Sequence, residues 1–574
     1  MFDSKKEKLF DVNETKKVTS VKTKKDNAFL FQGRKISAET LSGNFAKKYE
    51  STGNDFVDQF SALSSYKAPR EFSEIERDMS ILWSQDKKKT VLFTFFIRMI
   101  TRQTQLFDGV KTTSVQRGAG LKHEGIMRML WIYKKDENLF WHNLPLFVSI
   151  GSWKDIFQML SFDIQYHGWD KKILNWNIMF TFIASGLENP KTTDLVKKYL
   201  PQIKSNNKCT TVESQANNII AKWIASNLFG PKSNKSYLKY RKLKTSGTAH
   251  EWQQLISQKR FIDIDFNTVH GRALSLLVSS KFLENQNLVD EYDKWISSKP
   301  IAKFTGFVHE LFGKYTDSDG WGGGTLINMK SWQIKTLQKQ FDGLVETAKK
   351  DAKTDTSLIV VRDTSGSMSS NADGSNMACG DIAKSLALFF SEMLPDGHFS
   401  DSWIEFSDDA EFHKWKGENV YEKWQNDKSS YVGGTNFQSV VDLFVNIKNN
   451  GVDEKEFPTG ILCISDGEFN PSSLSETNVE TVYRKLRGAG FSESYINNFK
   501  IILWDLRNSY YGKGRKTKFE TYGTDVKNVY YFSGFEGSII AFLTGVEHQK
   551  TEPKNAEELF EAAMDQEILN MIII

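Results

Sequence analysis

The sequence predicts a multidomain chain in which an all-α part is followed by an α/β doubly wound part. At 574 residues the chain is longer than a single hydrophobic core usually grows, so at least two folding units are expected. The first half carries short apolar stripes at helical spacing, and the second half alternates short apolar runs with helical stripes. Hydrophobic residues make up 39% of the chain and aromatic residues 13%, which excludes a largely disordered protein.

Charge and cysteine content narrow the class of protein. The net charge is only +4, from 75 basic and 71 acidic residues, so any affinity for nucleic acid must come from local patches. Cys209, Cys379 and Cys463 lie far apart in the sequence, which predicts neither disulfides nor a cysteine zinc site and favours a reducing compartment. The first 25 residues lack the apolar run of a secretory signal, and the longest apolar run, 91–100, is about half the roughly 20 residues that a membrane span needs. We therefore expect a cytoplasmic protein without a membrane partner, or a protein of a host cytoplasm or virion if a phage encodes it.

The N-terminal half is predicted to be helical after a basic arm. Residues 1–55 cluster lysines without a sustained apolar period, which is typical of an extended arm. Residues 56–318 show no strictly alternating run, and their apolar stripes predict helices at 90–99, 125–133, 144–150, 156–160, 173–183 and 215–228. Such short helices would pack as a solenoid or a ring, although no fixed-period repeat is evident. Gly and Asp concentrate at residues 316–324, as in a connection between domains.

The C-terminal half is predicted to hold a sheet covered by helices. Residues 319–344 are expected to form a linker and a connecting helix. Short runs rich in β-branched and aromatic residues predict strands at 358–362, 403–406, 461–465, 501–504 and 529–532, with helices at 330–350, 378–393 and 437–447. This alternation predicts a parallel sheet with both faces covered, over residues 345–548. The tail, residues 549–574, predicts an amphipathic helix whose apolar end must dock on this chain or on a partner.

Three sequence pieces near predicted strand ends offer oxygen ligands for a metal. Open parallel sheets bind ligands beyond the carboxyl ends of their strands. One strand ends in Asp363-Thr364-Ser365-Gly366-Ser367, Gly433-Gly434-Thr435 opens a helix, and Asp466 follows another strand. Two carboxylates and three hydroxyls suit a hard cation, so Mg²⁺ is expected, with Mn²⁺ or Ca²⁺ as alternatives. The predicted ligands are Asp363, Ser365, Ser367, Thr435 and Asp466.

The order of these residues resembles the metal-ion-dependent adhesion site of von Willebrand factor A domains, where D-x-S-x-S is followed by a Thr and then an Asp. All five positions are intact. The resemblance implies that some ligands reach the metal through water and that a partner's carboxylate or other oxygen completes the coordination. Alternatively, the residues form unmetallated turns that cap helices. Because no base or nucleophile accompanies them, we expect binding and no enzyme activity, and a metal-dependent hydrolase is the least favoured alternative.

A helical half before such a domain resembles the Ro ribonucleoprotein family, whose TROVE module is a ring of HEAT-like helices closed by the A domain. The segments that carry this resemblance are residues 117–120 (RGAG), 146–157 (LFVSIGSWKDIF), 221–226 (AKWIAS) and 240–243 (YRKL). They are also similar to uncharacterised TROVE-like proteins of bacteria and their phages, over roughly residues 56–546. The resemblance implies a HEAT-like helical ring or solenoid followed by a von Willebrand factor A domain, in a scaffold that binds small noncoding or misfolded RNA.

Two basic clusters are the predicted RNA contacts. Residues 230–245 hold six basic side chains, no acid, and the interleaved Tyr237 and Tyr240, as phosphate contact and base stacking require. A second cluster, which includes Arg102, is expected in a glycine-containing loop region. The predicted contacts are Lys111, Arg117, Lys122, His123, Lys232, Lys235, Lys239, Arg241, Lys242 and Lys244. Alternatively, these charges are only solvated. The chain would then be a metal-dependent protein-interaction or assembly component, phage-encoded or virion-associated, that captures a partner's Asp or Glu without RNA.

Overall fold

The structure is a computed structural model. It describes residues 39–41, 47–49, 53–63, 70–246, 251–304, 306–317, 325–351, 357–372, 377–429, 431–466, 469–470, 478–506, 527–533 and 555–574. The chain divides into two units, residues 1–36 and residues 37–574, and every described residue belongs to the second. Most of the predicted N-terminal arm therefore lies outside the described residues, and its described part holds the antiparallel strands β1 (Glu39–Leu41) and β2 (Lys47–Tyr49). No helix among the described residues is long and apolar enough to cross a membrane.

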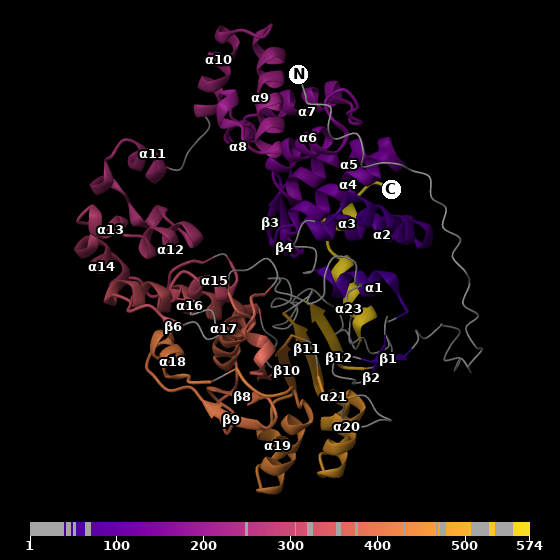
Figure 1. Ribbon diagram of the computed structural model, residues 1–574, viewed down its shortest axis with the longest axis vertical. Helices are drawn as coiled ribbons and strands as arrows, with labels where there is room; N and C mark the ends of the chain where they lie inside the picture. Colours follow the sequence, from indigo (N-terminus) through magenta and orange to yellow (C-terminus); the bar gives the residue numbers. More distant parts are fainter. Residues whose placement is uncertain are drawn as a thin grey trace. The chain divides into compact units, whose positions relative to one another are not determined.

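Helices form most of the first half, as the apolar stripes predict (Figure 1). They are α1 (Asp55–Ser61), α2 (Phe72–Gln85), α3 (Lys87–Arg98), α4 (Lys122–Lys135), α5 (Glu137–Ile150), α6 (Lys154–His167), α7 (Trp176–Glu188), α8 (Thr193–Tyr199), α9 (Val212–Phe229), α10 (Asn234–Thr245), α11 (Glu251–Ser257), α12 (Gly271–Ser279), α13 (Phe282–Asn285), α14 (Val289–Ser297) and α15 (Val308–Phe312). Side chains cap the N-termini of several of these helices. Asp136, for example, accepts a hydrogen bond from the Leu139 backbone N–H at the start of α5.

The expectation of a loop for the second basic cluster is confirmed for Arg117, which lies between β4 and α4, and is wrong for the other members. Arg102 and Lys111 lie on an antiparallel hairpin of β3 (Arg102–Gln105) and β4 (Lys111–Gln116), and Lys122 and His123 form the first turn of α4. The two strands consist almost entirely of polar residues, so no apolar alternation marked them in the sequence. The chain then turns at Gly118, where a Cβ would lie 2.5 Å from the Met99 carbonyl oxygen.

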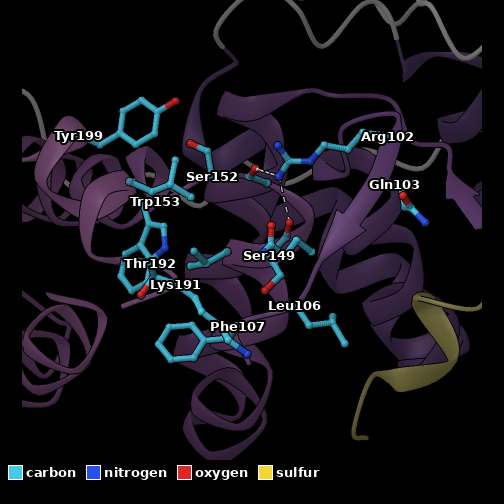
Figure 2. Close-up of a pocket in the computed structure, with 14 residues that line it drawn as sticks. Arg102, Gln103, Leu106, Phe107, Ser149, Ser152, Trp153, Lys191, Thr192 and Tyr199 are labelled. Carbon is cyan, nitrogen blue, oxygen red and sulfur yellow. Dashed lines mark hydrogen bonds between the residues drawn. The ribbon is translucent and has the colours of Figure 1, made fainter. Parts of the chain in front are cut away.

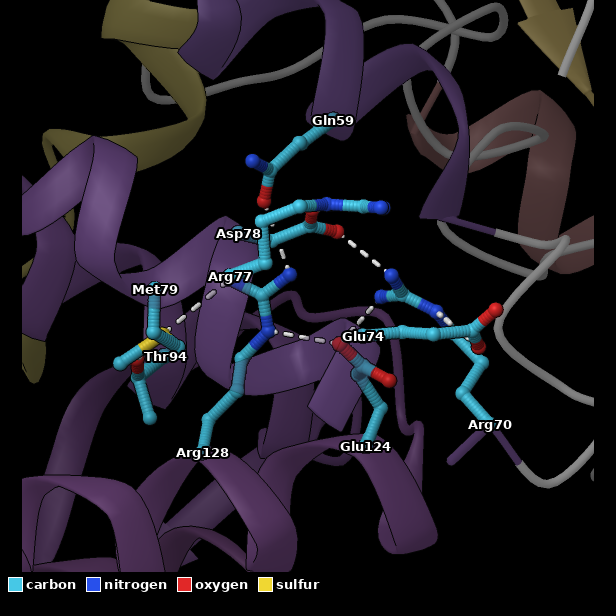
Figure 3. Close-up of polar contacts among 9 residues, drawn as sticks. All are labelled: Gln59, Arg70, Glu74, Arg77, Asp78, Met79, Thr94, Glu124 and Arg128. Carbon is cyan, nitrogen blue, oxygen red and sulfur yellow. Dashed lines mark hydrogen bonds and ion pairs between the residues drawn. The ribbon is translucent and has the colours of Figure 1, made fainter. Parts of the chain in front are cut away.

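Buried ion pairs join the helices of this half. The Glu124 carboxylate of α4 accepts from Arg128 Nε at 2.7 Å and from Arg70 Nη1 at 3.0 Å, and Arg70 also pairs with Asp78 of α2 (Figure 3). Arg98 of α3 binds Asp155 of α6, with Nε and Nη2 at 2.7 and 2.6 Å from Oδ2. Charges this deep persist only when they are paired, so these contacts fix how the helices pack.

Glycines make room for one of these pairs. A Cβ at Gly151 would lie 2.4 Å from Asp155 Oδ2, and a Cβ at Gly125 would lie 2.6 Å from the Arg98 Cβ. The glycine of the 146–157 segment is thus explained by the packing of a buried ion pair.

The second half is built on a six-stranded sheet with the strand order β12-β11-β10-β7-β8-β9. Its strands are β7 (Leu358–Asp363), β8 (Ser402–Phe406), β9 (Ala410–Lys414), β10 (Gly460–Ser465), β11 (Lys500–Asp505) and β12 (Val529–Ser533). All five predicted strands are confirmed, but the prediction of an all-parallel sheet is wrong, because β9 is an added antiparallel edge strand. Its five residues are half-buried or exposed, so it lacks the apolar run that marks the central strands.

Helices cover both faces of this sheet (Figure 1). They are α16 (Ser331–Asp351), α17 (Cys379–Ser391), α18 (Val420–Asn426), α19 (Gln438–Asn449), α20 (Asn478–Gly488) and α21 (Glu493–Asn498). Alternate residues of each strand face opposite sides, so Val360 and Leu462 share a core with α17, whereas Val361 and Cys463 share one with α19 and α20. The fold class is therefore a mainly helical part, with two short antiparallel pairs, followed by a doubly wound α/β sheet.

The connection between the halves contains a short antiparallel pair, β5 (Thr316–Asp317) and β6 (Thr325–Leu326). Residues 318–324, the centre of the predicted connection, lie outside the described residues. The helix α16 extends to Asp351, beyond the predicted boundary at 344, and its Trp332 packs into a separate small core with α11, α12 and α14. The exact domain boundaries stay a prediction.

The C-terminal tail docks on the N-terminal helices. Its helix α23 (Ala556–Met564) is shorter than predicted and is followed by a single 3₁₀ turn, Leu569–Met571. Phe560 of α23 lies with its ring centroid 5.7 Å from Phe56 and 5.5 Å from Phe93. Gln566 then binds the backbone of Arg117 twice, accepting from its N–H and donating to its carbonyl, each at 2.8 Å. The tail thus ties the two ends of residues 37–574 together.

We expect Gln566→Ala to lower the free energy of unfolding by about 1–2 kcal/mol, because it removes both of these hydrogen bonds from a partly buried backbone. Urea denaturation of the full chain measures this change. Asn570→Ala, at an exposed position of the same tail, is the matched control and should be neutral. Equal stability of the two variants would show that the tail contact contributes nothing.

Candidate metal site

Two of the predicted metal ligands, Asp363 and Asp466, lie at the point in the sheet where the strand order reverses. From β7 the chain continues to β8 on one side, and from β10 it continues to β11 on the other, while β7 and β10 pair side by side. Loops that leave two neighbouring parallel strands in opposite directions open a crevice at the carboxyl edge, which is where such sheets bind ligands. Asp363 ends β7, and Asp466 follows β10 directly.

Hydrogen bonds hold the Asp363 carboxylate in place. Oδ1 accepts from the Ser365 backbone N–H at 2.8 Å, and Oδ2 accepts from Ser465 Oγ at 2.5 Å. The hydroxyls of Ser365 and Ser367 lie 3.1 Å apart. Asp363 and Ser365 are buried and Ser367 is exposed, so this cluster of oxygens begins inside the domain and ends at its surface.

The electrostatics of the site favour a cation. Burial, and next the nearby Asp466 carboxylate, raise the pKa of Asp363 to about 7, against the hydrogen bonds from Ser465 and Ser365. Two carboxylates held together inside a protein repel each other. A divalent ion between them would remove this repulsion.

Thr435 lies on a loop that is fixed to both neighbouring pieces. The Val432 N–H donates to the Thr364 carbonyl at 2.9 Å, and the Asn470 N–H, just after β10, donates to the Thr435 carbonyl at 2.8 Å. Gly433 has a φ of +88°, a conformation that favours glycine, and a Cβ at Gly434 would lie 2.8 Å from the Asp408 carboxylate. The Gly434 N–H also donates to Asp408 Oδ1 at 2.9 Å. The buried Thr435 is therefore held by its backbone on both sides.

A buried ionic cluster anchors the start of the same loop. Arg362, next to Asp363, donates from Nη1 to Asp427 Oδ2 at 2.6 Å and lies 4.0 Å from the ring centroid of Trp403. Lys384 of α17 lies 3.3 Å from the same Asp427 oxygen. Two cations thus share one carboxylate. Burial lowers the pKa of Lys384 to about 8, against the attraction of Asp427 and with a further contribution from the charge of Arg362.

We expect this cluster to make stability depend on pH. The folded pKa of Lys384 is lower than its unfolded value, so the unfolded chain binds the extra proton between about pH 8 and pH 10.5 and stability rises across that window. Lys384→Met removes the titrating group. Below pH 8 the variant should be more stable than wild type by roughly 2 kcal/mol, and the difference should shrink as pH rises toward 10. Urea denaturation at pH 7, 8.5 and 10 measures it, and a constant difference would contradict the assignment.

The donor set fits a hard divalent cation. Among the described residues, no group of three or more His, Cys, Asp or Glu side chains is placed to hold a metal, so soft or imidazole sites are not seen there. The five predicted ligands offer two carboxylates and three hydroxyls, which suits Mg²⁺ or Mn²⁺. The Ser365 and Ser367 hydroxyls already lie close to each other and to Asp363, and Asp466 is near enough to shift the pKa of Asp363.

The basic residues of the first cluster lie on and beside α10. Lys235, Lys239 and Lys242 recur at the spacing of one helix face, and they are exposed, as are Lys232 and Arg241. Lys244 instead donates to the carbonyls of Lys198 and Leu200 at the end of α8. Tyr240 is fully buried and its hydroxyl donates to the Pro201 carbonyl, so it belongs to the core and offers no surface for a base.

The second cluster does not form one surface. Lys111 is exposed on β4, whereas Arg117 is only 7% exposed and its backbone binds the C-terminal tail. His123 packs edge-to-face on Phe162, and burial lowers its pKa. Burial, and next the charge of Lys154, lower the pKa of Lys122 to about 8. Lys154, the first residue of α6, was missed in the sequence because no other basic residue lies near it there, and only the fold brings it near Lys122.

Comparisons with known proteins find a family model that is similar to part of the second half. A family model described as "Domain of unknown function (DUF7788)" matches residues 357–570. No curated protein matches the chain. Among solved structures, the crystal structure of the Deinococcus radiodurans RO (RSR) protein aligns with 88% of this chain and 95% of its own, at 11% identity and a TM-score of 0.33.

Proposed function

We propose that the sheet domain binds one divalent cation, most simply Mg²⁺, through Asp363, Ser365, Ser367, Thr435 and Asp466. The observation that carries the proposal is the buried Asp363 carboxylate at the carboxyl edge of β7, held by Ser365 and Ser465 beside a second carboxylate. Unmetallated turns would explain the hydrogen bonds to Asp363. They give no reason to bury two neighbouring carboxylates at the ligand-binding edge of the sheet.

The cation would serve to hold a partner. Ser367 and Gly366 are exposed, so an ion at this site is reachable from solvent. Five protein oxygens, some of them acting through water, leave room in a six-coordinate shell for an oxygen from a carboxylate or a phosphate. The proposed role is therefore metal-dependent binding, and no catalytic step is assigned to the site.

The metal proposal is tested with Asp466→Asn in the full chain. Isothermal titration should show one Mg²⁺ per wild-type chain and at least a tenfold weaker affinity in the variant, because one charged ligand is lost. Asp442→Asn, which changes an exposed acid on α19, is the matched control and should bind as wild type does. Absence of Mg²⁺ and Mn²⁺ binding by the folded wild type would refute the proposal.

A second function, RNA binding by the helical half, is favoured by the exposed basic face of α10. Three lysines on one helix face, extended by Lys232 and Arg241, could contact successive phosphates. The proposed partner is a small noncoding or misfolded RNA held on this face, with the metal site as a separate binding point. In the alternative, the protein binds a protein partner through the metal site, and the basic face of α10 has no role in binding.

These two functions differ in their dependence on salt and on metal. The triple variant Lys235→Glu, Lys239→Glu and Lys242→Glu should lose RNA binding, and the wild-type affinity should fall steeply with salt. Reversal of three exposed lysines of the sheet domain, Lys414, Lys416 and Lys455, is the matched control. Equal RNA affinity in both triple variants, or no RNA affinity in wild type, would favour the protein-interaction alternative.

A further inference from the structure

A pocket of about 230 Å³ lies in the helical half and shares no residue with the metal site or with the basic face of α10. It is lined by β3, the end of α5, the residues before α6 and the helix α8 (Figure 2). Pockets for drug-sized ligands are usually larger, about 300–1,000 Å³, so this one fits a small molecule.

The pocket follows the helix α8 along its length. Thr192, Leu195 and Tyr199 line it at the spacing of one helix face. Lys191, just before α8, donates to the Asp108 carbonyl at the turn of the β3–β4 hairpin. Tyr199 follows Thr192 at a distance of about 10 Å along the helix axis. The pocket therefore has two separate ends, with Lys191 at one end and Tyr199 at the other.

Arg102 belongs to the end with Tyr199. It is the first residue of β3, away from the hairpin turn, and its Nη2 donates to the carbonyls of Ser149 and Gly151 at 3.1 and 2.9 Å. Figure 2 shows its guanidinium on the same side of the pocket as Tyr199, away from Lys191. The two cations that line the pocket therefore do not meet at one point.

The positive charge of Arg102 is not neutralised by an ion pair within the described residues. Arg98 and Asp155 lie next to Gly151 of the pocket wall and neutralise each other, with Arg98 Nη2 2.6 Å from Asp155 Oδ2. The pKa of Arg102 is lowered by loss of hydration and next by the charge of Arg98, against smaller effects of Tyr199 and Asp155. A ligand with one negative charge would balance this end of the pocket.

Three side chains at this end have protons available for a ligand. The Nε and Nη1 groups of Arg102 form no hydrogen bond with the described residues. Ser152 Oγ accepts from the Lys154 N–H at 3.0 Å, which leaves its own proton available. Tyr199 is half-buried, and its hydroxyl has no hydrogen-bond partner in the described part of the chain. A carboxylate accepts about four hydrogen bonds through its two oxygens, so it suits these donors.

The wall between the two ends is apolar. Leu195 lies between them on α8, and the other apolar side chains of the wall are Leu106, Phe107, Val148 and Trp153. The ring of Trp153 is held in place by Phe182, on which it stacks with ring centroids 5.2 Å apart. A polar end that continues into an apolar wall is complementary to a molecule with one charged end and an apolar body.

We propose that this pocket binds a small monocarboxylate with a narrow apolar body. The carboxylate lies at Arg102, Ser152 and Tyr199, and the body follows Leu195 and Trp153 toward the hairpin turn. Carboxylate is favoured over phosphate because one unpaired guanidinium stands at this end, and a phosphate dianion would leave one of its charges without a partner.

The test uses octanoate as the probe and the full chain. Isothermal titration should show one octanoate per chain, bound at least tenfold more tightly than the neutral octanamide. Arg102→Gln removes the charge at the carboxylate end and should weaken octanoate binding at least tenfold. Lys191→Gln is the matched control, because it removes the other cation of the pocket at the opposite end, and its affinity should stay within about threefold of wild type. Equal weakening by the two variants would overturn the proposal.

A second pair of variants decides the question if Arg102→Gln does not fold. Leu195 is 49% exposed, so Leu195→Glu and Leu195→Gln should both fold, and their melting temperatures verify this. Leu195→Glu places a carboxylate beside the bound ligand and should bind octanoate at least fivefold more weakly than the neutral Leu195→Gln. Equal affinities of these two variants would contradict the proposed position of the ligand.

3-Phenylpropanoate distinguishes two sources of the same chemistry. Tighter binding of this probe than of octanoate would support the site with an aromatic acid as its ligand. Tighter binding of octanoate would support the site with an acyl chain as the apolar body. Failure of wild type to bind either probe would overturn the proposal without affecting the metal site.

Discussion

Replacement of Asp363 by asparagine is expected to weaken Mg²⁺ binding at least a hundredfold and, at the same time, to stabilise the metal-free protein. The substitution removes a charged ligand, which accounts for the lost affinity. It also removes a buried carboxylate that lies beside Asp466 and whose pKa is raised to about 7. Each unit of that shift corresponds to about 1.4 kcal/mol, so the metal-free variant should gain roughly 2–4 kcal/mol at pH 8.

The gain in the free energy of unfolding should depend on pH, because it comes from the titration of Asp363. The folded pKa of Asp363 exceeds its unfolded value, so wild-type stability falls as pH rises from about 4 to 7 and stays low above 7. The gain of Asp363→Asn should therefore be largest at pH 8 and nearly absent at pH 4, as measured by urea denaturation in chelator. Saturating Mg²⁺ should reverse the order of stability at pH 8. A variant that is less stable than metal-free wild type at pH 8 would contradict the account.

Replacement of Asp155 by alanine is expected to lower the free energy of unfolding by about 3–5 kcal/mol. Asp155 is fully buried and is the ion-pair partner of the buried Arg98, and its Oδ2 also accepts from the Ser152 N–H at 3.0 Å. The variant leaves a guanidinium inside the protein without its counter-charge, which costs far more than the loss of a surface pair. Urea denaturation of the full chain measures the change.

Two controls distinguish the cost of leaving Arg98 without its counter-charge from the cost of lost packing. Asp194→Ala removes an acid that is 56% exposed and 3.8 Å from Lys197, and it should change stability by less than about 0.5 kcal/mol. The double variant Arg98→Met with Asp155→Leu removes both charges and should recover at least half of the loss. If the double variant is as unstable as Asp155→Ala, the cost comes from packing and the charge argument is wrong.

The elements that could be identified in the sequence are those that bury most of their side chains. The central strands β7, β10 and β11 each contain an apolar run that is buried on both faces, and the helix α17 is buried along its whole length. The hairpin β3–β4 and the edge strand β9 could not be identified, because their side chains are mostly polar and partly exposed. The hairpin is held by residues far away in the sequence, among them Glu567 of the C-terminal tail, which accepts from the Thr113 and Ser114 N–H groups. Such long-range partners leave no local pattern.

The proposed metal ligands could be picked out in the sequence because three of them are close together in it. Asp363, Ser365 and Ser367 lie within five residues, and Asp466 follows an apolar strand, so residue type and strand position were enough to predict the cluster. The surrounding support was not predictable: Asp427 and Lys384 meet Arg362 only in the fold. The exposure of the basic residues could not be predicted for the same reason. The lysines of α10 are exposed and Arg117 is buried, although the sequence gives no sign of this difference.

The most direct test of the metal proposal is a crystal structure of the full chain grown with Mn²⁺, using anomalous scattering to locate the ion. We expect one anomalous peak at the carboxyl edge of β7 and β10, between the Asp363 and Asp466 carboxylates and beside Ser365, Ser367 and Thr435. Crystals of Asp466→Asn should show no such peak. A well-ordered site without a peak, or a Mn²⁺ ion bound only elsewhere, would contradict it.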